Sequence, residues 1–125
     1  MLYTSDVNRR AFQALLDGSK RVEIRTCIPS DPLDYSLLQV GDLLRLSEWP
    51  PPSSREIQGI IDGVRHYSSA YTLFENEGIT RTCSSNPTSI NEAVDRIHAL
   101  TDYKQAIIQH GLFAIELKEV ELVHE

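Results

Sequence analysis

The chain has 125 residues, enough for one ordinary domain, and its composition of 41% hydrophobic and 24% charged residues is typical of globular proteins. No apolar run approaches the roughly 20 residues that cross a bilayer, and the N-terminus lacks the basic and apolar segments of a signal peptide. We therefore expect a soluble cytoplasmic protein, and the net charge of −6 argues against a broad surface that grips nucleic acid through its phosphates.

The charge is uneven along the chain. Residues 1–66 hold eight Lys or Arg and nine Asp or Glu, whereas residues 67–125 hold four and nine. The first half is therefore near neutral and rich in arginine, which allows a local positive cleft within an acidic protein.

The first quarter of the chain predicts a helix and then a strand. Apolar residues spaced three and four apart indicate a helix over residues 6–17, with Ser5 or Asp6 as its N-cap and Gly18 at its C-terminus. Apolar and charged residues alternate over residues 21–26, which predicts a strand with one apolar face and one charged face.

The middle of the chain predicts two more strands, over residues 43–48 and residues 56–66. The segment between them, residues 49–54, contains three consecutive prolines and predicts a stiff connection. Gly59 and Gly63 would allow the second strand to coil or bulge, as a closed sheet requires.

The last third predicts helices followed by a strand. A short helix is expected over residues 69–76 and another over residues 101–110; between them, Ser89 and Glu92 fit the two positions of a capping box. The final segment predicts a strand whose apolar residues change parity near residues 118–119, which indicates a bulge or a bend.

The order of these elements favours one fold class. The strands do not alternate regularly with crossover helices, so a doubly wound parallel sheet is not expected. We predict a single α+β domain over residues 1–125, with a mostly antiparallel, curled sheet.

Three ionisable residues are concentrated where the first predicted helix meets the first predicted strand. Glu23 and Arg25 are two residues apart, so their side chains leave the same face of the strand about 6–7 Å apart, and Lys20 lies at its entrance. A carboxylate beside cations stays ionised, and a desolvated lysine can act as a base or nucleophile. On spacing alone, a solvated strand face with weak ion pairs is the simpler interpretation.

These residues also form a recognisable pattern. The spacing of Gly18, Lys20, Glu23 and Arg25 resembles the G-x-K-x-x-E-x-R signature of the ASCH domain family.

Other segments resemble the same family in the same order. Residues 40–42 are similar to its Gly-Asp turn before the second strand, residues 67–77 to the start of its helical segment, and residues 111–115 to its closing strand. The resemblance therefore covers nearly the whole chain.

The resemblance implies a PUA-like, antiparallel or mixed β-barrel with helices covering its openings, and a role in RNA binding or RNA metabolism. It also implies a cleft lined by Lys20, Glu23 and Arg25. One branch of the family hydrolyses an acylated cytidine nucleoside with a lysine, a threonine and a glutamate. Lys20 matches that lysine and Glu77 is the candidate for the glutamate, but Glu23 stands where the branch has its threonine.

Two aromatic residues are further candidates for the ligand site. Trp49 could stack on a base, although closing the end of a barrel is the simpler role, and Tyr67 could line the cleft or pack on a helix. The four histidines and the cysteines Cys27 and Cys83 lack metal-ligand spacing, and no phosphate-binding loop or nucleophile elbow is present. We expect no metal and no cofactor.

Three hypotheses follow, in decreasing order of support. The first is a module that binds RNA, a nucleotide or a modified nucleoside through Lys20, Glu23 and Arg25, with Trp49 and Tyr67 as further contacts. The second is a hydrolase for an acylated nucleoside or RNA that uses Lys20 with Glu23 or Glu77. The third is a protein-interaction module, which the acidic second half of the chain would suit.

Overall fold

The computed structural model describes residues 1–51 and 54–123. Two residues of the predicted proline-rich connection, Pro52 and Ser53, lie outside these ranges.

Five strands and four helices make up the described chain. The strands are β1 (Leu2–Asn8), β2 (Val22–Arg25), β3 (Leu43–Trp49), β4 (Glu56–Tyr67) and β5 (Leu112–Leu122). The helices are α1 (Arg9–Asp17), α2 (Ala70–Glu77), α3 (Ile90–His98) and α4 (Tyr103–His110), and a single 3₁₀ turn spans Tyr35–Leu37.

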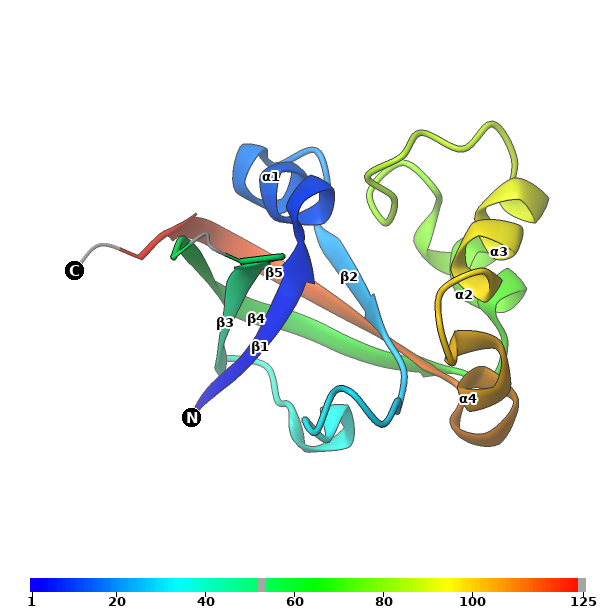
Figure 1. Ribbon diagram of the computed structural model, residues 1–125, viewed down its shortest axis with the longest axis horizontal. Coiled ribbons are helices and arrows are strands. Elements are labelled where there is room, and N and C mark those ends of the chain that lie inside the picture. Colours follow the sequence, from blue (N-terminus) through cyan, green and yellow to red (C-terminus); the bar gives the residue numbers. More distant parts are fainter. Residues whose placement is uncertain (52–53, 124–125) are drawn as a thin grey trace.

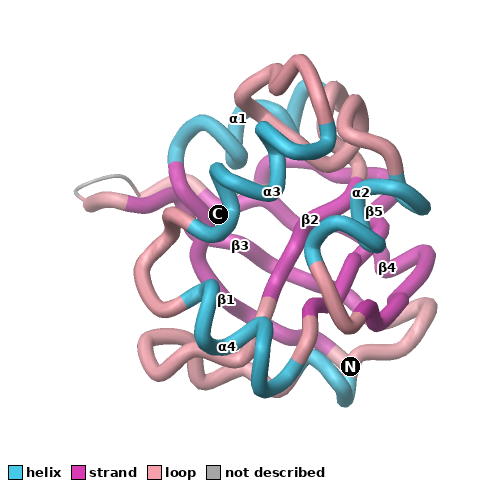
Figure 2. The backbone as a smooth tube through the Cα atoms, turned by 90° about the vertical axis from the view of Figure 1, so that its right-hand side faces the viewer, coloured by secondary structure: helices cyan, strands magenta, loops and turns pink. Residues whose placement is uncertain are grey.

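The strands form one mixed sheet in the order β1-β3-β4-β5-β2. Strands β1 and β3 are parallel, and every other neighbouring pair is antiparallel. The sheet curls into a half-barrel whose edges are β1 and β2, with α1 above it and α2, α3 and α4 gathered at one end (Figures 1 and 2). This confirms the predicted α+β class with a curled, mixed sheet and covering helices.

Strand β1 is the element that the sequence pattern missed. Residues 2–8 pair with β3 in parallel register, so Ser5 and Asp6 are strand residues and do not cap a helix. Helix α1 starts at Arg9, and the side chain of Asn8 caps it by accepting a hydrogen bond from the Ala11 amide at 2.9 Å. The prediction of a helix from residue 6 was wrong because pairing with a distant strand outweighs local periodicity.

Of two other local predictions, one is confirmed and the other is confirmed in part. Glu119 adopts a positive φ of 52°, and the register between β4 and β5 shifts beside it, which is the predicted bulge. Ser89 caps α3 by accepting from the Glu92 amide at 3.1 Å, whereas the Glu92 carboxylate binds Thr88, so only half of the capping box forms.

The apolar residues divide into two cores, one on each side of β2. The first lies within the curl beneath α1 and includes Phe12, Leu46 and Ile61. The second joins Val22 and Ile24 to helices α2, α3 and α4. Because side chains alternate along a strand, Glu23 and Arg25 project away from the second core, toward the open side of the half-barrel.

Gly111, where α4 meets β5, is the tightest backbone approach that involves a glycine. Its φ is 72°, and a Cβ atom there would lie 2.5 Å from the Tyr67 carbonyl oxygen. Gly18 also has a positive φ, 87°, but a Cβ atom there would have no neighbour within 4 Å.

We expect Gly111→Ala to lower the free energy of unfolding by about 3 kcal/mol, because a strained φ is combined with a clash against backbone. Gly18→Ala is the matched control and should cost only the strain of its φ, about 1–2 kcal/mol. Urea unfolding of both variants measures the difference, and equal losses would show that the contact with Tyr67 relaxes freely.

Candidate functional site

A cleft of about 780 Å³ opens where the two edge strands of the half-barrel meet the helices. Its walls include residues 6–8 of β1, residues 23–25 of β2, the loop at residues 82–85, and residues from α1, α3 and α4. The cleft therefore sits over the seam that the sheet leaves open between β1 and β2, and both apolar cores hold its walls in place.

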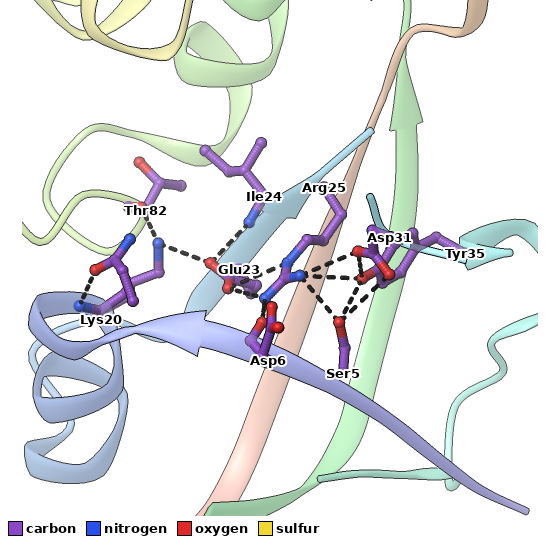
Figure 3. A network of polar contacts seen from close by, with 11 residues as sticks. Ser5, Asp6, Lys20, Glu23, Ile24, Arg25, Asp31, Tyr35 and Thr82 are labelled. Atoms are coloured by element: carbon purple, nitrogen blue, oxygen red, sulfur yellow. Dashed lines mark hydrogen bonds and ion pairs between the residues drawn. The ribbon is translucent and has the colours of Figure 1, made fainter. Parts of the chain in front are cut away.

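Glu23 is the centre of the charged network in this cleft (Figure 3). Its Oε1 atom accepts hydrogen bonds from Lys20 Nζ at 3.0 Å and from the Ile24 amide at 3.3 Å. Its Oε2 atom accepts from Arg25 Nη2 at 2.8 Å and from Nε at 3.3 Å. A carboxylate has about four acceptor positions, so Glu23 has none left for a ligand.

Arg25 is saturated in the same way and joins the two edges of the sheet (Figure 3). Beyond Glu23, its Nη2 atom donates to the backbone oxygen of Asp6 on β1 at 2.6 Å. Its Nη1 atom donates to Ser5 Oγ, Asp31 Oδ2 and Tyr35 Oη at 3.1–3.2 Å. A guanidinium has five hydrogens, and all of them have acceptors within the protein. Arg25 thus works as a clamp across the seam.

Lys20 retains hydrogen-bonding capacity. Its Nζ atom donates to Glu23 Oε1 and, at 2.9 Å, to the backbone oxygen of Thr82. A lysine side chain can donate up to three hydrogen bonds, and the described residues accept two of them, so one is left for a ligand in the cleft.

The charges in this network are nearly removed from water. Lys20, Glu23 and Arg25 are 7%, 5% and 7% exposed. Burial by itself would raise the pKa of Glu23, but the positive charges of Lys20 and Arg25 outweigh it and lower that pKa to about 2. The predicted charged face of β2 therefore exists, but it is buried and paired, in contrast to the simpler interpretation of a solvated face.

Tyr103, at the start of α4, is a site residue that the sequence did not indicate. It lines the cleft near Glu23, Arg25 and Asp31, and burial raises the pKa of its hydroxyl to about 12. Its hydroxyl has no hydrogen-bond partner among residues 1–51 and 54–123. The hydroxyl is therefore protonated and can donate a hydrogen bond within the cleft. No sequence motif indicates Tyr103, because α4 is far in sequence from the segment that contains Lys20, Glu23 and Arg25.

Only some of the site residues that the sequence predicted lie together in the structure. Lys20, Glu23, Arg25 and Trp49 all line the cleft. Trp49 is 54% exposed, so it lies on the rim and does not close the barrel.

Glu77 and Tyr67 belong to a different cluster and do not line the cleft. The Glu77 carboxylate accepts hydrogen bonds from Arg65 Nε and Nη2 at 2.6 and 2.7 Å, from Arg81 Nη2 at 2.8 Å, and from the Tyr67 hydroxyl. The hydrogen bonds of Arg65, together with those of Tyr67 and Arg81, lower the pKa of Glu77 to about 2, although burial opposes this. The structure thus separates Glu77 from Lys20, with which the hydrolase hypothesis paired it.

The Glu77 cluster still acts on the cleft through the backbone. Arg81, held by Glu77, uses its carbonyl oxygen to accept from the amides of Arg21 and Val22 at 2.8 and 3.1 Å, where β2 begins. The next residue, Thr82, supplies the carbonyl that holds Lys20. Glu77 therefore contributes to the placement of Lys20 without touching the cleft.

The described residues contain no group of three or more His, Cys, Asp or Glu side chains placed to hold a metal ion. None of the helices in residues 1–51 and 54–123 is long and apolar enough to cross a membrane.

The clamp role of Arg25 predicts that lysine cannot replace it. We expect Arg25→Lys to lower the free energy of unfolding by about 3 kcal/mol or more, because an ammonium cannot reach both edge strands and leaves buried acceptors unpaired. Arg45→Lys is the control, since Arg45 is partly buried and, within residues 1–51 and 54–123, its guanidinium donates hydrogen bonds to Gln58 alone. Its cost should stay below about 1 kcal/mol in the same urea titration.

The lowered pKa of Glu23 predicts a loss of stability in acid. The folded pKa, about 2, lies below the ordinary value of 4.5, so the stabilisation is complete above pH 4.5 and is lost as the pH falls toward 2. It amounts to something on the order of 3 kcal/mol. The double variant Lys20→Met/Glu23→Gln should show a shallower fall in unfolding free energy between pH 4.5 and 2.

The exposed Glu75→Gln variant serves as the control for that titration and should keep the wild-type slope. A double variant with the wild-type slope would assign the acid sensitivity to other carboxylates, of which Glu77 is the foremost.

Comparison with known proteins places the fold. No protein-family model matches the chain, and no curated protein matches its sequence. The crystal structure of hypothetical protein PH0355 matches with a TM-score of 0.73 at 21% identity, over 98% of this chain and 100% of that one. The solution NMR structure of protein PF0455 from Pyrococcus furiosus matches with a TM-score of 0.65 at 18% identity, over the full length of both chains. At these identities the likeness establishes a shared fold.

Proposed function

We propose that this chain is an ASCH-type domain that binds a single nucleotide or modified nucleoside, either free or at the end of an RNA, in the cleft over the β1–β2 seam. The observation that carries the proposal is a ligand-sized cleft built around three nearly buried charged residues, Lys20, Glu23 and Arg25. Burying such a network costs more stability than an apolar core of similar volume, which favours a role beyond folding.

The size of the cleft supports a small ligand. Its volume of about 780 Å³ falls within the range of roughly 300–1,000 Å³ that is typical of small-molecule sites. The net charge of −6 disfavours a long RNA tract, since such complexes depend on many phosphate contacts.

The groups that remain available in the cleft suit a nucleoside. Lys20 has one hydrogen to donate and Tyr103 has its hydroxyl, so both can meet the oxygen and ring-nitrogen acceptors of a base. The indole of Trp49 at the rim offers a face on which a base can stack. Glu23 and Arg25, which are saturated, act in this proposal by fixing Lys20 and the edge strands.

The two other hypotheses have less support. A hydrolase of the kind considered would need a carboxylate with spare capacity beside Lys20, but Glu23 is saturated and Glu77 does not line the cleft. An interaction module would be favoured if the domain's own side chains filled the cleft, but the cleft is open.

The proposal predicts that ligand binding requires Lys20. A panel of the four ribonucleosides, N4-acetylcytidine and their 5′-monophosphates should contain at least one compound that raises the melting temperature of the wild type, because a ligand that binds only the folded state stabilises it. Lys20→Met should weaken that binding at least tenfold, since it removes a charged donor inside the cleft.

Lys104→Met, on the exposed face of α4 and outside the cleft, is the control and should bind as the wild type does. Isothermal titration calorimetry measures the affinities, and the melting temperatures without ligand check that both variants fold. A Lys20→Met protein that is folded and keeps the wild-type affinity would contradict the proposal.

A further inference from the structure

Two arginines that the charged network does not use line the same cleft from different elements. Arg10 lies in α1, which packs on the half-barrel, and Arg96 lies in α3, which packs in the helical group. The two arginines therefore reach the cleft from different helices. Figure 1 shows α1 over the half-barrel and α3 among the helices at its end.

The charge balance of the cleft differs between these two arginines. Four cationic side chains and three carboxylates line it. Glu23 and Asp31 are paired with Lys20 and Arg25 in the buried network. Arg96 forms an ion pair with Glu92, which does not line the cleft. The positive charge of the outer cleft that no ion pair within the described residues neutralises is therefore that of Arg10, with the Asp6 carboxylate in the same lining.

Arg10 is available for a ligand. Arg10 is exposed, and its guanidinium makes no hydrogen bond or ion pair with any residue of the described ranges 1–51 and 54–123. A guanidinium in this state has all five hydrogens to offer, and its planar fork matches two oxygens of a phosphate.

The guanidinium of Arg96 is held in place by hydrogen bonds but retains donors for a ligand. Its Nη1 atom donates to the backbone oxygen and the Oγ atom of Ser85, at 2.6 and 2.8 Å, and its Nη2 atom donates to Glu92. The Nε hydrogen and one Nη2 hydrogen have no acceptor within the part of the chain that the structure describes. Because Ser85 Oγ accepts from Arg96, its own hydrogen is free to donate, and the hydroxyl of Ser84 lines the cleft beside it.

We propose that Arg10 and Arg96, with the hydroxyls of Ser84 and Ser85, form a phosphate subsite for the nucleotide bound in the cleft. This inference rests on the proposed function and refines it, because it makes the ligand a phosphorylated nucleotide and not a bare nucleoside. The nucleoside part lies between Lys20 and Tyr103. Asp6 is within electrostatic range of Tyr103 and is an acceptor for the ribose hydroxyls there.

The test compares each nucleoside of the panel with its own 5′-monophosphate by calorimetry at low salt. The monophosphate of the preferred base should bind at least tenfold more tightly than the nucleoside, and this ratio should shrink as salt is added, because the arginines are exposed. Arg10→Ala should bring the ratio markedly closer to one, although Arg96 and the two serines remain, and should leave the affinity for the nucleoside unchanged.

Arg9→Ala is the matched control. Arg9 is the neighbouring residue of the same helix, it is exposed, and it does not line the cleft, so its removal should leave the ratio at the wild-type value. Ser84→Ala provides a second, uncharged test and should reduce the ratio less than Arg10→Ala does.

A 5′-phosphorylated hexanucleotide distinguishes the two sources of the phosphate. Binding at least as tight as that of the monophosphate indicates an RNA end, and much weaker binding indicates a free nucleotide; the subsite stands in both cases. Equal affinities of nucleoside and monophosphate, or equal effects of Arg9→Ala and Arg10→Ala, would overturn the subsite alone. If no compound of the panel binds, both the subsite and the proposed function fail.

Discussion

The side chain of Arg25 links the two edge strands of the sheet, which no backbone ladder joins. A five-stranded sheet that curls without completing a barrel has two edges, and here they belong to β1 and β2. Arg25 projects from β2, reaches the Asp6 carbonyl of β1, and is itself held by Glu23 and Asp31. The position of the cleft, the orientation of Lys20 and the burial of the charged network all depend on this bridge.

The network illustrates a division of labour among charged residues that resemble one another in sequence. Two of its members, Glu23 and Arg25, spend their entire hydrogen-bonding capacity inside the protein, and Lys20 does not. Counting donors and acceptors therefore distinguishes Glu23 and Arg25, which have a structural role, from Lys20, which can bind a ligand. Their positions alone do not make this distinction, because all three residues line the cleft.

Local patterns in the sequence predicted most of the fold, because most of its elements are defined by local signals. The alternation in β2, the cap at Ser89 and the bulge at Glu119 depend on residues adjacent in the chain, and the structure contains all three. Strand β1 was not predicted because it pairs with β3, about 40 residues away, and because apolar and polar residues alternate only weakly along it.

The candidate site was predictable in part for the same reason. Lys20, Glu23 and Arg25 are close together in sequence, so their convergence follows from strand geometry. Their burial does not, since it requires Tyr35, Asp31 and β1 to arrive from elsewhere. Tyr103 and Thr82 reach the cleft only through the packing of the helices, and the same packing draws Glu77 toward Arg65 and Arg81.

The hydrogen bonds at the outer edge of β2 also affect contacts with other molecules. The outer edge of a strand normally exposes amide groups that can pair with a strand from another molecule. On β2, the Val22 amide donates to the Arg81 carbonyl, and the Ile24 amide donates to the carboxylate of Glu23. A strand arriving from a second copy finds these donors already engaged, so the bonds that shape the cleft also protect this edge of the sheet against aggregation.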